Sequence, residues 1–500
     1  MEETLGKKAV RAAKWSLVTQ LVSKLISPIT TLVLAHLLTP DVFGVVALVT
    51  MVTSFADLFS DAGFQKYLIQ HEYNDRSKFS LSANVAFWTN LAISMFLWAI
   101  IAVFRDQLAL LLGNPEIGIA VAIACASLPL TSSISVQTAV YQREFDFKTL
   151  FYSRVGSSLL ILAVAVPLAL VDCGYWSMIV ATIASNLLLA AWLTLRSKWR
   201  PSIQYSFREL GEMLSFSSWT LIEAISIWIT SWAGAFILGS YLNEYYLGLY
   251  NTSVSLVNAV VGIVAGTVNP VAFASLSRLQ SDRSKFDNLF YKMQKYLGFV
   301  LIPMSFALFV FADAIVGLYL GEAWLETATF LGFYSLSGSF VVVFSYISSD
   351  AYRALGKPRW SLLGQVMFLF FLIPSLVIGA TSSYETLSIV VPAFRLVGSV
   401  FTNFIICKFL MRLSPFKMLA NLKWVYLATL LISLPIYLVI KCFGIGYVGQ
   451  IILFFTYILG YGLISLFITD LRSTLFDIAD RFGIKKWIDN VIPSFLRSQY

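Results

Sequence analysis

The sequence predicts an all-α polytopic membrane protein with about fourteen transmembrane helices. Apolar residues make up 58% of its 500 residues and charged residues only 12%, whereas about a quarter of the residues in a soluble protein are charged. Apolar runs of spanning length follow one another with short polar links between them. These observations exclude a soluble enzyme, and no hydrophilic block is long enough to fold as a separate catalytic domain.

The predicted helices follow from hydropathy along the chain, because each run approaches the roughly 20 residues that a helix needs to cross a bilayer. Their approximate limits are 15–38, 42–65, 79–104, 117–140, 150–171, 175–195, 213–239, 245–274, 296–318, 327–350, 360–380, 386–408, 423–441 and 447–469. The last two are free of charge over most of their length, which is typical of helices that contact lipid or border an apolar groove. Beyond them, residues 476–492 mix apolar and basic positions, which predicts an amphipathic helix on the inner leaflet.

Basic residues predict how these helices are oriented. With the N-terminus inside, all but five of the 35 lysines and arginines fall in inner segments; the exceptions are Lys24, Arg105, Arg154, Arg395 and Lys441. This asymmetry predicts that both termini lie in the cytoplasm. The net charge of +8 is then a feature of the topology, so we expect no nucleic-acid partner. The four cysteines lack metal-ligand spacing, so we expect no metal site.

The first two helices each carry an ionisable residue at depth. Lys24 lies about 14 Å from the inner end of the first helix and Asp57 about 12 Å from that of the second, at 1.5 Å per residue. A charge at this depth costs roughly 3 kcal/mol, so it is usually kept where it faces a partner or a hydrated cavity. Polar residues at helical spacing, Gln20 among them, extend both positions into stripes. We therefore expect a shared cavity; the alternative for Lys24 is that its side chain snorkels to the surface.

The chain repeats a short pattern after 204 residues. Residues of the first helical hairpin recur at this offset: Leu34, Leu38, Phe43 and Gly44 match Leu238, Leu242, Leu247 and Gly248. Six helices separate the copies, so the halves are parallel repeats related by an axis along the membrane normal, as in some transporters. The seventh and eighth helices carry polar faces that include Glu223 and Asn258. The sequence thus predicts two pseudo-symmetric six-helix lobes around a central cavity, plus two extra helices.

This organisation divides the chain into five parts. We expect an N-terminal lobe over 1–200, a cytoplasmic linker over 201–212, a C-terminal lobe over 213–412, two further helices over 413–470 and a cytoplasmic amphipathic tail over 471–500.

Two further basic residues lie within predicted helices. Arg395 follows Pro392 and is close to mid-membrane, where it requires a carboxylate or an anionic ligand. Both a structural ion pair between helices and a ligand contact satisfy that requirement. Arg154 lies only about 6 Å from the inner edge, so snorkelling to the surface is the simpler interpretation of its position.

Several short strings resemble the polysaccharide-export branch of the multidrug/oligosaccharidyl-lipid/polysaccharide flippase superfamily, the Wzx-type flippases. These strings are Thr39-Pro40-Asp41-Val42-Phe43-Gly44, Gln142-Arg143-Glu144-Phe145, Gly174-Tyr175-Trp176, Trp199-Arg200-Pro201, Ile237-Leu238-Gly239, Leu247-Gly248-Leu249-Tyr250 and Ser275-Leu276-Ser277-Arg278-Leu279-Gln280. Two positions depart from the family pattern: Gly234 replaces an acidic residue that members often carry, and Ala274 replaces a usual proline. For that reason no ion-coupling role is transferred to Glu223.

The resemblance implies a transporter, not an enzyme, in the bacterial inner membrane. It implies that an undecaprenyl-diphosphate-linked oligosaccharide is flipped by alternating access for O-antigen, exopolysaccharide or capsule synthesis. Membrane lipids, and a polymerase and chain-length proteins of the pathway, are its implied partners; no cofactor is expected, and coupling to a proton or sodium ion stays open. From depth and polar stripes we expect substrate contacts at Gln20, Lys24, Asp57, Arg154, Glu223, Asn258 and Arg395.

Two other functions are compatible with parts of the sequence. One is a cation-coupled multidrug or metabolite exporter of the same superfamily, with Asp57 or Glu223 as the ion site. The other is a membrane glycosyltransferase or polymerase. The short outer loops, whose carboxylates are scattered singly, disfavour that enzyme.

Overall fold

The computed structural model describes residues 15, 18–19, 22, 26–61, 63–71, 73 and 75–481. Gln20 and Lys24 lie outside these residues, and the side chain of Glu223 is also outside the description. Within the described residues the regular secondary structure is entirely helical, as the sequence predicts. By their contacts the residues form two compact units, Met1–Thr252 and Ser253–Tyr500. The predicted lobes rest on sequence repetition, not on contacts, and stay a prediction.

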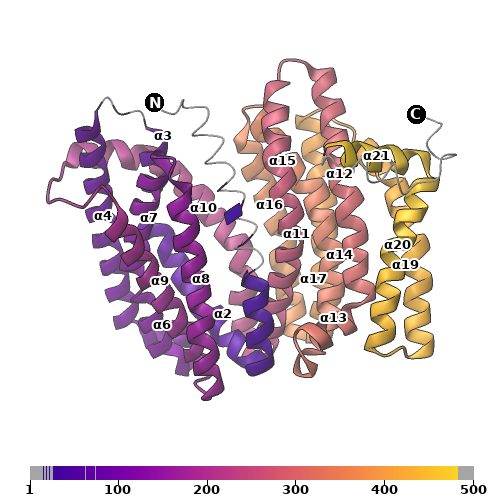
Figure 1. The fold of residues 1–500 in the computed structure, drawn as a ribbon, viewed down its shortest axis with the longest axis horizontal. Helices are drawn as coiled ribbons and strands as arrows, with labels where there is room; N and C mark the ends of the chain where they lie inside the picture. The colour runs from indigo at the N-terminus through magenta and orange to yellow at the C-terminus, as the bar shows by residue number, and fades with distance from the viewer. Residues whose placement is uncertain are drawn as a thin grey trace. The chain divides into compact units, whose positions relative to one another are not determined.

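The first unit contains the described helices up to α10 and the beginning of α11 (Figure 1). After an apolar helix over Ile26–Leu37, its elements are α2 (Pro40–Asp61), α3 (Phe64–Gln70), α4 (Arg76–Val103), α5 (Arg105–Leu111), the 3-10 helix η1 (Pro115–Ile117), α6 (Gly118–Cys125), α7 (Leu128–Arg143), α8 (Phe147–Leu170), α9 (Trp176–Arg196), α10 (Phe207–Tyr241) and α11 (Glu244–Arg278).

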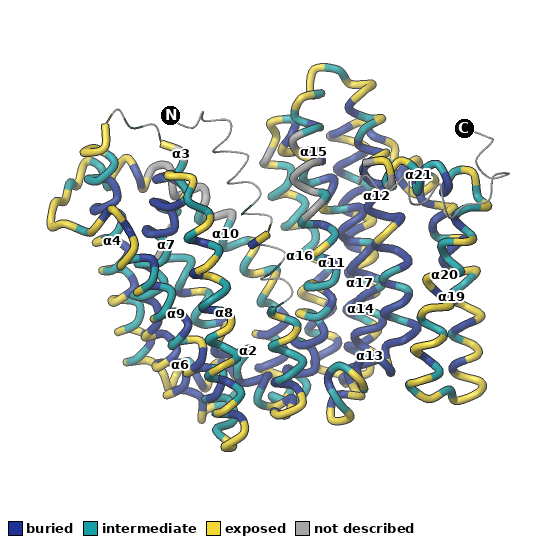
Figure 2. Tube along the Cα trace, in the orientation of Figure 1, coloured by how far each residue is buried: buried dark blue, intermediate teal, exposed yellow. Residues whose placement is uncertain are grey.

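The second unit contains the rest of α11 and the elements that follow it. These are α12 (Arg283–Val310), α13 (Ala312–Tyr319), η2 (Glu322–Trp324), α14 (Thr327–Val341), the π-helical turn η3 (Val342–Tyr346), α15 (Ile347–Ala354), α16 (Pro358–Ser382), α17 (Tyr384–Ile405), a second π-helical turn η4 (Ile406–Leu410), α18 (Pro415–Asn421), α19 (Lys423–Phe443), α20 (Tyr447–Phe467) and α21 (Thr469–Arg481). Figure 2 shows α14 largely buried, whereas α19 and α20 expose much of their length.

Thirteen helices of the described chain are long and apolar enough to cross a membrane, and a shorter apolar helix over Ile26–Leu37 lies within the first predicted span. The polytopic prediction is therefore confirmed. We call the end of each unit at which most lysines and arginines lie the basic end; it is the end predicted to face the cytoplasm. The turns after Leu38 and Tyr241 lie at the opposite end.

Several helices begin earlier than hydropathy predicts, because polar side chains cap them. The predicted helices leave residues 275–295 as a link, yet α12 begins at Arg283. Asp282 accepts a hydrogen bond from the backbone N–H of Lys285 at 3.2 Å, which satisfies a first-turn donor. Hydrogen bonds from the Lys285 side chain and backbone hold the pKa of Asp282 below its ordinary value, so the cap is ionised. Ser206 caps α10 in the same way.

The connection between α9 and α10 is fastened to α4. Ser202 accepts a hydrogen bond from Asn84 Nδ2 at 2.7 Å, and its own N–H donates to Asn84 Oδ1 at 3.0 Å. The indole of Trp88 donates to the Ser202 carbonyl at 2.8 Å. Ser82, also on α4, donates a hydrogen bond to the Glu209 side chain in the first turn of α10. The start of α10 and the connection before it are therefore bound to α4 by specific hydrogen bonds.

Candidate functional site

Asp57 lies on α2 among polar and aromatic side chains of the first unit. It is half-buried, and the Thr131 hydroxyl of α7 donates to its Oδ1 at 2.6 Å. One turn away, Ser54 accepts a hydrogen bond from the Trp228 indole of α10 at 3.0 Å. The polar stripe predicted on the second helix thus makes contacts with α7 and α10, as expected for a stripe that is kept out of lipid.

The same region contains an aromatic pair that the sequence stripes did not reveal. The rings of Phe55 and Trp228 lie 4.7 Å apart between centroids, and Phe55 is also 5.1 Å from Phe59. Phe55 remains partly exposed. An exposed aromatic face beside hydroxyl and carboxylate oxygens is a surface on which an amphipathic ligand can stack and form hydrogen bonds. Such pairs are missed because each aromatic residue alone looks like an ordinary lipid-facing position.

Arg395 is the most buried of the predicted site residues whose side chains are described, with 8% of its surface exposed. It projects from α17, and its guanidinium carbon lies 3.7 Å from the ring centroid of Tyr334 on α14. This cation–π contact partly offsets the cost of burying the charge. Its Nη1 has no hydrogen-bond partner among the residues that the structure describes. Arg395 is therefore a buried cation with an unused donor, a position suited to an anionic group.

Polar side chains continue from Arg395 along the same face of α17. Ser399 and Asn403 follow at one-turn intervals and are buried. The hydroxyls of Ser399 and Ser345 lie 2.7 Å apart, and Asn403 Nδ2 donates to Ser345 at 2.8 Å. Ser345 lies in η3, and π-helical turns occur frequently at functional sites. The spacing of residues 395, 399 and 403 was available in the sequence, but the partner on η3 was not.

The remaining predicted residues are placed on helix surfaces. Arg154 is exposed on α8, where a snorkelling side chain would lie. Asn258 is exposed on α11 in the second unit. The backbone of Glu223 belongs to α10, five residues before Trp228. Gln20, Lys24 and the side chain of Glu223 lie outside the described residues, so their contacts with the other predicted site residues stay a prediction.

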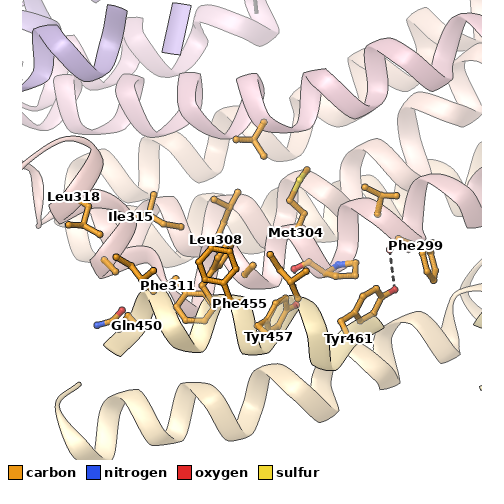
Figure 3. A pocket seen from close by; sticks show the side chains of 18 residues that line it. Phe299, Met304, Leu308, Phe311, Ile315, Leu318, Gln450, Phe455, Tyr457 and Tyr461 are labelled. Carbon is orange, nitrogen blue, oxygen red and sulfur yellow. Dashed lines mark hydrogen bonds between the residues drawn. The ribbon is translucent and has the colours of Figure 1, made fainter. Parts of the chain in front are cut away.

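An apolar groove runs along α12 in the second unit (Figure 3). Its volume is about 760 Å³. The stretch that lines it from Phe299 of α12 to Phe311, the residue after the end of this helix, is about 18 Å long at 1.5 Å per residue. The lining residues are Val260, Phe299, Val300, Pro303, Met304, Ala307, Leu308, Phe311, Ala314, Ile315, Leu318, Gln450, Ile451, Phe454, Phe455, Tyr457, Ile458 and Tyr461. This composition fits a hydrocarbon chain.

Two tyrosines of α20 fix one wall of the groove against the other. Pro303 has no N–H, so the Phe299 carbonyl lacks its helical partner. Tyr461 donates to that carbonyl at 3.0 Å, as Figure 3 shows. Tyr457 donates to the Pro303 carbonyl at 2.8 Å. Because an unsatisfied carbonyl in hydrocarbon is costly, these bonds hold α20 at a defined position on α12.

Ion pairs hold the helices of the groove at both ends. At the end with few basic residues, Lys441 of α19 lies 2.9 Å from Asp313 of α13. At the basic end, Lys292 and Lys295 of α12 pair with Asp477 and Asp470 of α21. The tail predicted to lie on the inner leaflet therefore begins with a helix docked on α12. The remainder of the predicted amphipathic segment lies outside the described residues.

Comparisons with known proteins agree with this architecture. A family profile of polysaccharide biosynthesis proteins matches residues 33–329. The succinoglycan biosynthesis transport protein ExoT of Rhizobium meliloti is 26% identical over 339 residues, which are 67% of this chain and 68% of the relative. The lipopolysaccharide biosynthesis protein WzxC of Escherichia coli is 22% identical over 389 residues, 75% of this chain and 76% of the relative.

Solved structures share the fold. The lipid II flippase MurJ, in an inward closed conformation, has a TM-score of 0.72 at 14% identity, covering 91% of this chain and 98% of the other. An inward-facing multidrug resistance transporter of the MATE family has a TM-score of 0.62, covering 80% and 96%.

The helical architecture, the apolar groove and these likenesses define the protein as a multi-pass membrane transporter of the flippase and exporter class, not an enzyme. Within that class, the chain belongs to the polysaccharide biosynthesis protein family, whose profile covers more than half of its length.

Proposed function

We propose that this transporter flips an undecaprenyl-diphosphate-linked oligosaccharide from the inner to the outer leaflet of the bacterial cytoplasmic membrane by alternating access. The observation that carries the proposal is the apolar groove between α12 and α20, about 760 Å³ in volume. A polyprenyl tail is a long, narrow apolar chain that carries a methyl branch on each isoprene unit. A fixed groove of about 18 Å binds part of such a tail while the rest remains in lipid.

The saccharide head requires polar partners during the crossing. Each hydroxyl stripped of its hydrogen bonds in hydrocarbon costs several kcal/mol, so unaided flipping is negligible. Ser54, Asp57 and Thr131 offer replacement oxygens in the first unit. The ring pair of Phe55 and Trp228 offers an apolar face for a sugar ring beside them. We assign the saccharide to this region.

The diphosphate requires positive charge. Arg395 is buried, stacked on Tyr334, and has an unused donor at Nη1. An arginine fork matches phosphate oxygens in geometry and charge. Lys24 and Arg154 are further contacts proposed from their positions in the sequence. A cationic drug would be repelled by these basic side chains, which weighs against the multidrug exporter.

The proposed function also requires a defined orientation of the transporter in the membrane and defined partners on the outer side. The basic end of each unit faces the cytoplasm, with both termini there, and a polymerase and chain-length proteins act on the exported product. If transport is coupled to a proton or sodium ion, Asp57 or Glu223 would bind that ion. The alternative function, a cation-coupled multidrug exporter, would use the same two residues in this way.

A deletion strain tests the proposal. Loss of the transporter should remove surface polysaccharide and lead to accumulation of the lipid-linked oligosaccharide on the cytoplasmic side, and a plasmid copy should restore export. Normal surface glycan together with new sensitivity to cationic drugs would favour the exporter instead.

A further inference from the structure

Three lysines at the basic end of the second unit have no carboxylate partner. Lys408 belongs to η4, Lys417 to α18 and Lys423 to the first turn of α19, and all three are exposed. None of their ammonium groups forms an ion pair or a hydrogen bond within the described part of the chain. The sequence itself contains no aspartate or glutamate from residue 386 to residue 469. These segments therefore carry positive charge that they cannot neutralise themselves.

The lysines of α12, at the same end of the unit, have a different environment. Lys292 pairs with Asp477 and Lys295 pairs with Asp470, both on α21. Their ammonium groups are neutralised by carboxylates of the same unit, and these ion pairs hold α21 on α12. Both groups of lysines contribute equally to the orientation of the chain in the membrane. The lysines of η4, α18 and α19 are in addition available to an external anion.

Aromatic rings hold two of these lysines in position. The Nζ of Lys408 lies 5.0 Å from the ring centroid of Phe404 and 5.3 Å from that of Phe409. The Nζ of Lys423 lies 5.3 Å from the ring of Trp424. A cation–π contact attracts an ammonium group to the face of a ring without neutralising its charge. The positive charge is thus positioned, and it remains available to a ligand.

Exposed aromatic side chains accompany these charges. Phe409 and Phe416 have 66% and 69% of their surfaces exposed. Phe416 lies at nearly a right angle to Phe404, with 5.8 Å between the ring centroids, and Phe404 is also the ring that Lys408 contacts. Lys408 and the exposed side of α18 therefore belong to one surface. We call this surface the η4–α18 patch; it consists of Lys408, Phe409, Phe416, Lys417, Lys423 and Trp424.

The patch is preformed, because α18 is anchored to α12. Asn421 Nδ2 donates to the carbonyl of Tyr291 on α12 at 2.8 Å. Met418 is buried, with 1% of its surface exposed. The Nζ of Lys417 lies 4.6 Å from the centroid of the Tyr291 ring. A preformed surface binds a ligand at a lower entropic cost than a surface that must be ordered on binding.

We propose that the η4–α18 patch binds an anionic phospholipid of the membrane in which the protein is embedded. The phosphodiester of such a head group carries a negative charge, and lysine ammonium groups bind phosphate oxygens as point charges. Basic clusters beside membrane helices recognise anionic head groups in this way. The exposed rings of Phe409 and Phe416 contact the first carbons of the acyl chains, as apolar side chains of interfacial helices do.

The charge of the patch selects this ligand over two other candidates. The sequence beyond the described residues contains Lys485, Lys486 and Arg497 against a single Asp489, so it brings positive charge and not negative charge. A zwitterionic phospholipid has no net charge, and its own ammonium group would approach the three lysines of the patch. A head group that carries only negative charge is complementary to the patch.

Native mass spectrometry of the purified full chain measures this binding, because it counts the lipids that stay bound after release from detergent. Lys408→Gln combined with Lys417→Gln and Lys423→Gln removes the three charges. The wild type should retain one more tightly bound phosphatidylglycerol than this variant, and its affinity for phosphatidylcholine should be at least about tenfold weaker. Equal retention of phosphatidylglycerol by the wild type and the variant would overturn the proposal.

The matched control removes three positive charges from the basic end of the first unit. Lys66, Arg76 and Lys78 are exposed there, and no large apolar side chain is exposed among the described residues from 63 to 80. Lys66→Gln combined with Arg76→Gln and Lys78→Gln should retain as much phosphatidylglycerol as the wild type. If both triple variants lose the lipid equally, binding follows net charge alone and the patch is not a specific site.

Phe416→Gln tests the apolar half of the patch while all three lysines stay in place. It should weaken phosphatidylglycerol binding by about three- to tenfold, because the exposed ring no longer covers the acyl chains. Phe443→Gln, which alters an exposed residue at the other end of α19, should leave binding unchanged. Wild-type affinity in Phe416→Gln would contradict the proposal.

Two further measurements make the result specific. Inorganic diphosphate at constant ionic strength should leave phosphatidylglycerol bound, because it lacks the acyl chains that the rings contact; release of the lipid would assign the lysines to a diphosphate group instead and overturn the proposal. The melting temperatures of all variants in detergent without added lipid should match that of the wild type, since every altered side chain is exposed. None of these measurements requires transport, so their outcome is independent of the proposed function.

Discussion

Tyr461 donates its hydroxyl hydrogen to the carbonyl oxygen of Phe299, the oxygen that Pro303 leaves without a helical partner. A side chain of α20 thereby supplies the hydrogen bond that the Phe299 carbonyl of α12 lacks because of Pro303. The bond lies inside the groove that we assign to the prenyl tail, so the same interaction that satisfies the backbone also sets the distance between the groove walls.

Tyr461→Phe should destabilise the transporter by about 1–3 kcal/mol, because it leaves a buried carbonyl without a donor. Thermal unfolding in a lipid nanodisc measures the loss. Tyr437→Phe removes a hydroxyl from a ring that stacks on Phe309 and serves as the control. An unchanged melting temperature for Tyr461→Phe would show that the bond contributes nothing.

Arg395→Leu should abolish export while leaving stability within about 1 kcal/mol of the wild type, because replacing a buried charge with an apolar side chain is often neutral or stabilising. Export and the melting temperature are measured on the same protein. Arg105→Gln removes an exposed arginine and is the control. A structural role is indicated instead if Arg395→Leu unfolds readily and its residual folded fraction exports normally.

Val300→Trp should slow export at least about tenfold by filling the groove from a partly exposed position, without overpacking the core. Ile452→Trp adds the same bulk at an exposed residue of α20 that does not line the groove. A lipid-linked oligosaccharide with a short prenyl chain should escape the block. Equal effects of the two tryptophans would remove the groove from the mechanism.

Asp57→Asn should fold normally, because the amide oxygen can still accept the hydrogen bond from Thr131. Its export should fall about tenfold, since hydrogen bonds to a carboxylate are roughly twice as strong as those to a neutral oxygen. Initial export rates at matched protein levels provide the measurement. Wild-type rates in this variant would assign Asp57 to packing alone.

Hydropathy was sufficient to predict the polytopic helical fold, because each span must satisfy its backbone hydrogen bonds internally. The basic residues predict the orientation of the helices, which stays a prediction. Hydropathy placed the start of α12 thirteen residues late, because the cap at Asp282 is a local polar signal inside a hydrophilic stretch. Capping side chains, and not hydropathy alone, therefore determine the residue at which such a helix begins.

The candidate site was predictable only where one residue is anomalous by itself. Arg395 is conspicuous at mid-membrane, but its stacking on Tyr334 joins residues 61 positions apart and requires the packing of α14 on α17. Tyr461 gave no signal, because its partner is a backbone atom freed by a distant proline. The recurrence of Gly44 and Gly248 predicted a repeat, whereas the close approach of Gly44 to the backbone carbonyl of Glu244 could be seen only in the fold.

The most direct measurement of the central claim uses purified transporter in liposomes with a fluorescent undecaprenyl-diphosphate-linked oligosaccharide. An impermeant quencher reports how fast the head group moves between leaflets. The account predicts rapid movement with the wild-type protein and movement at the rate of empty liposomes with Arg395→Leu. The account would be contradicted if liposomes that contain the wild-type protein moved the lipid between leaflets no faster than protein-free liposomes.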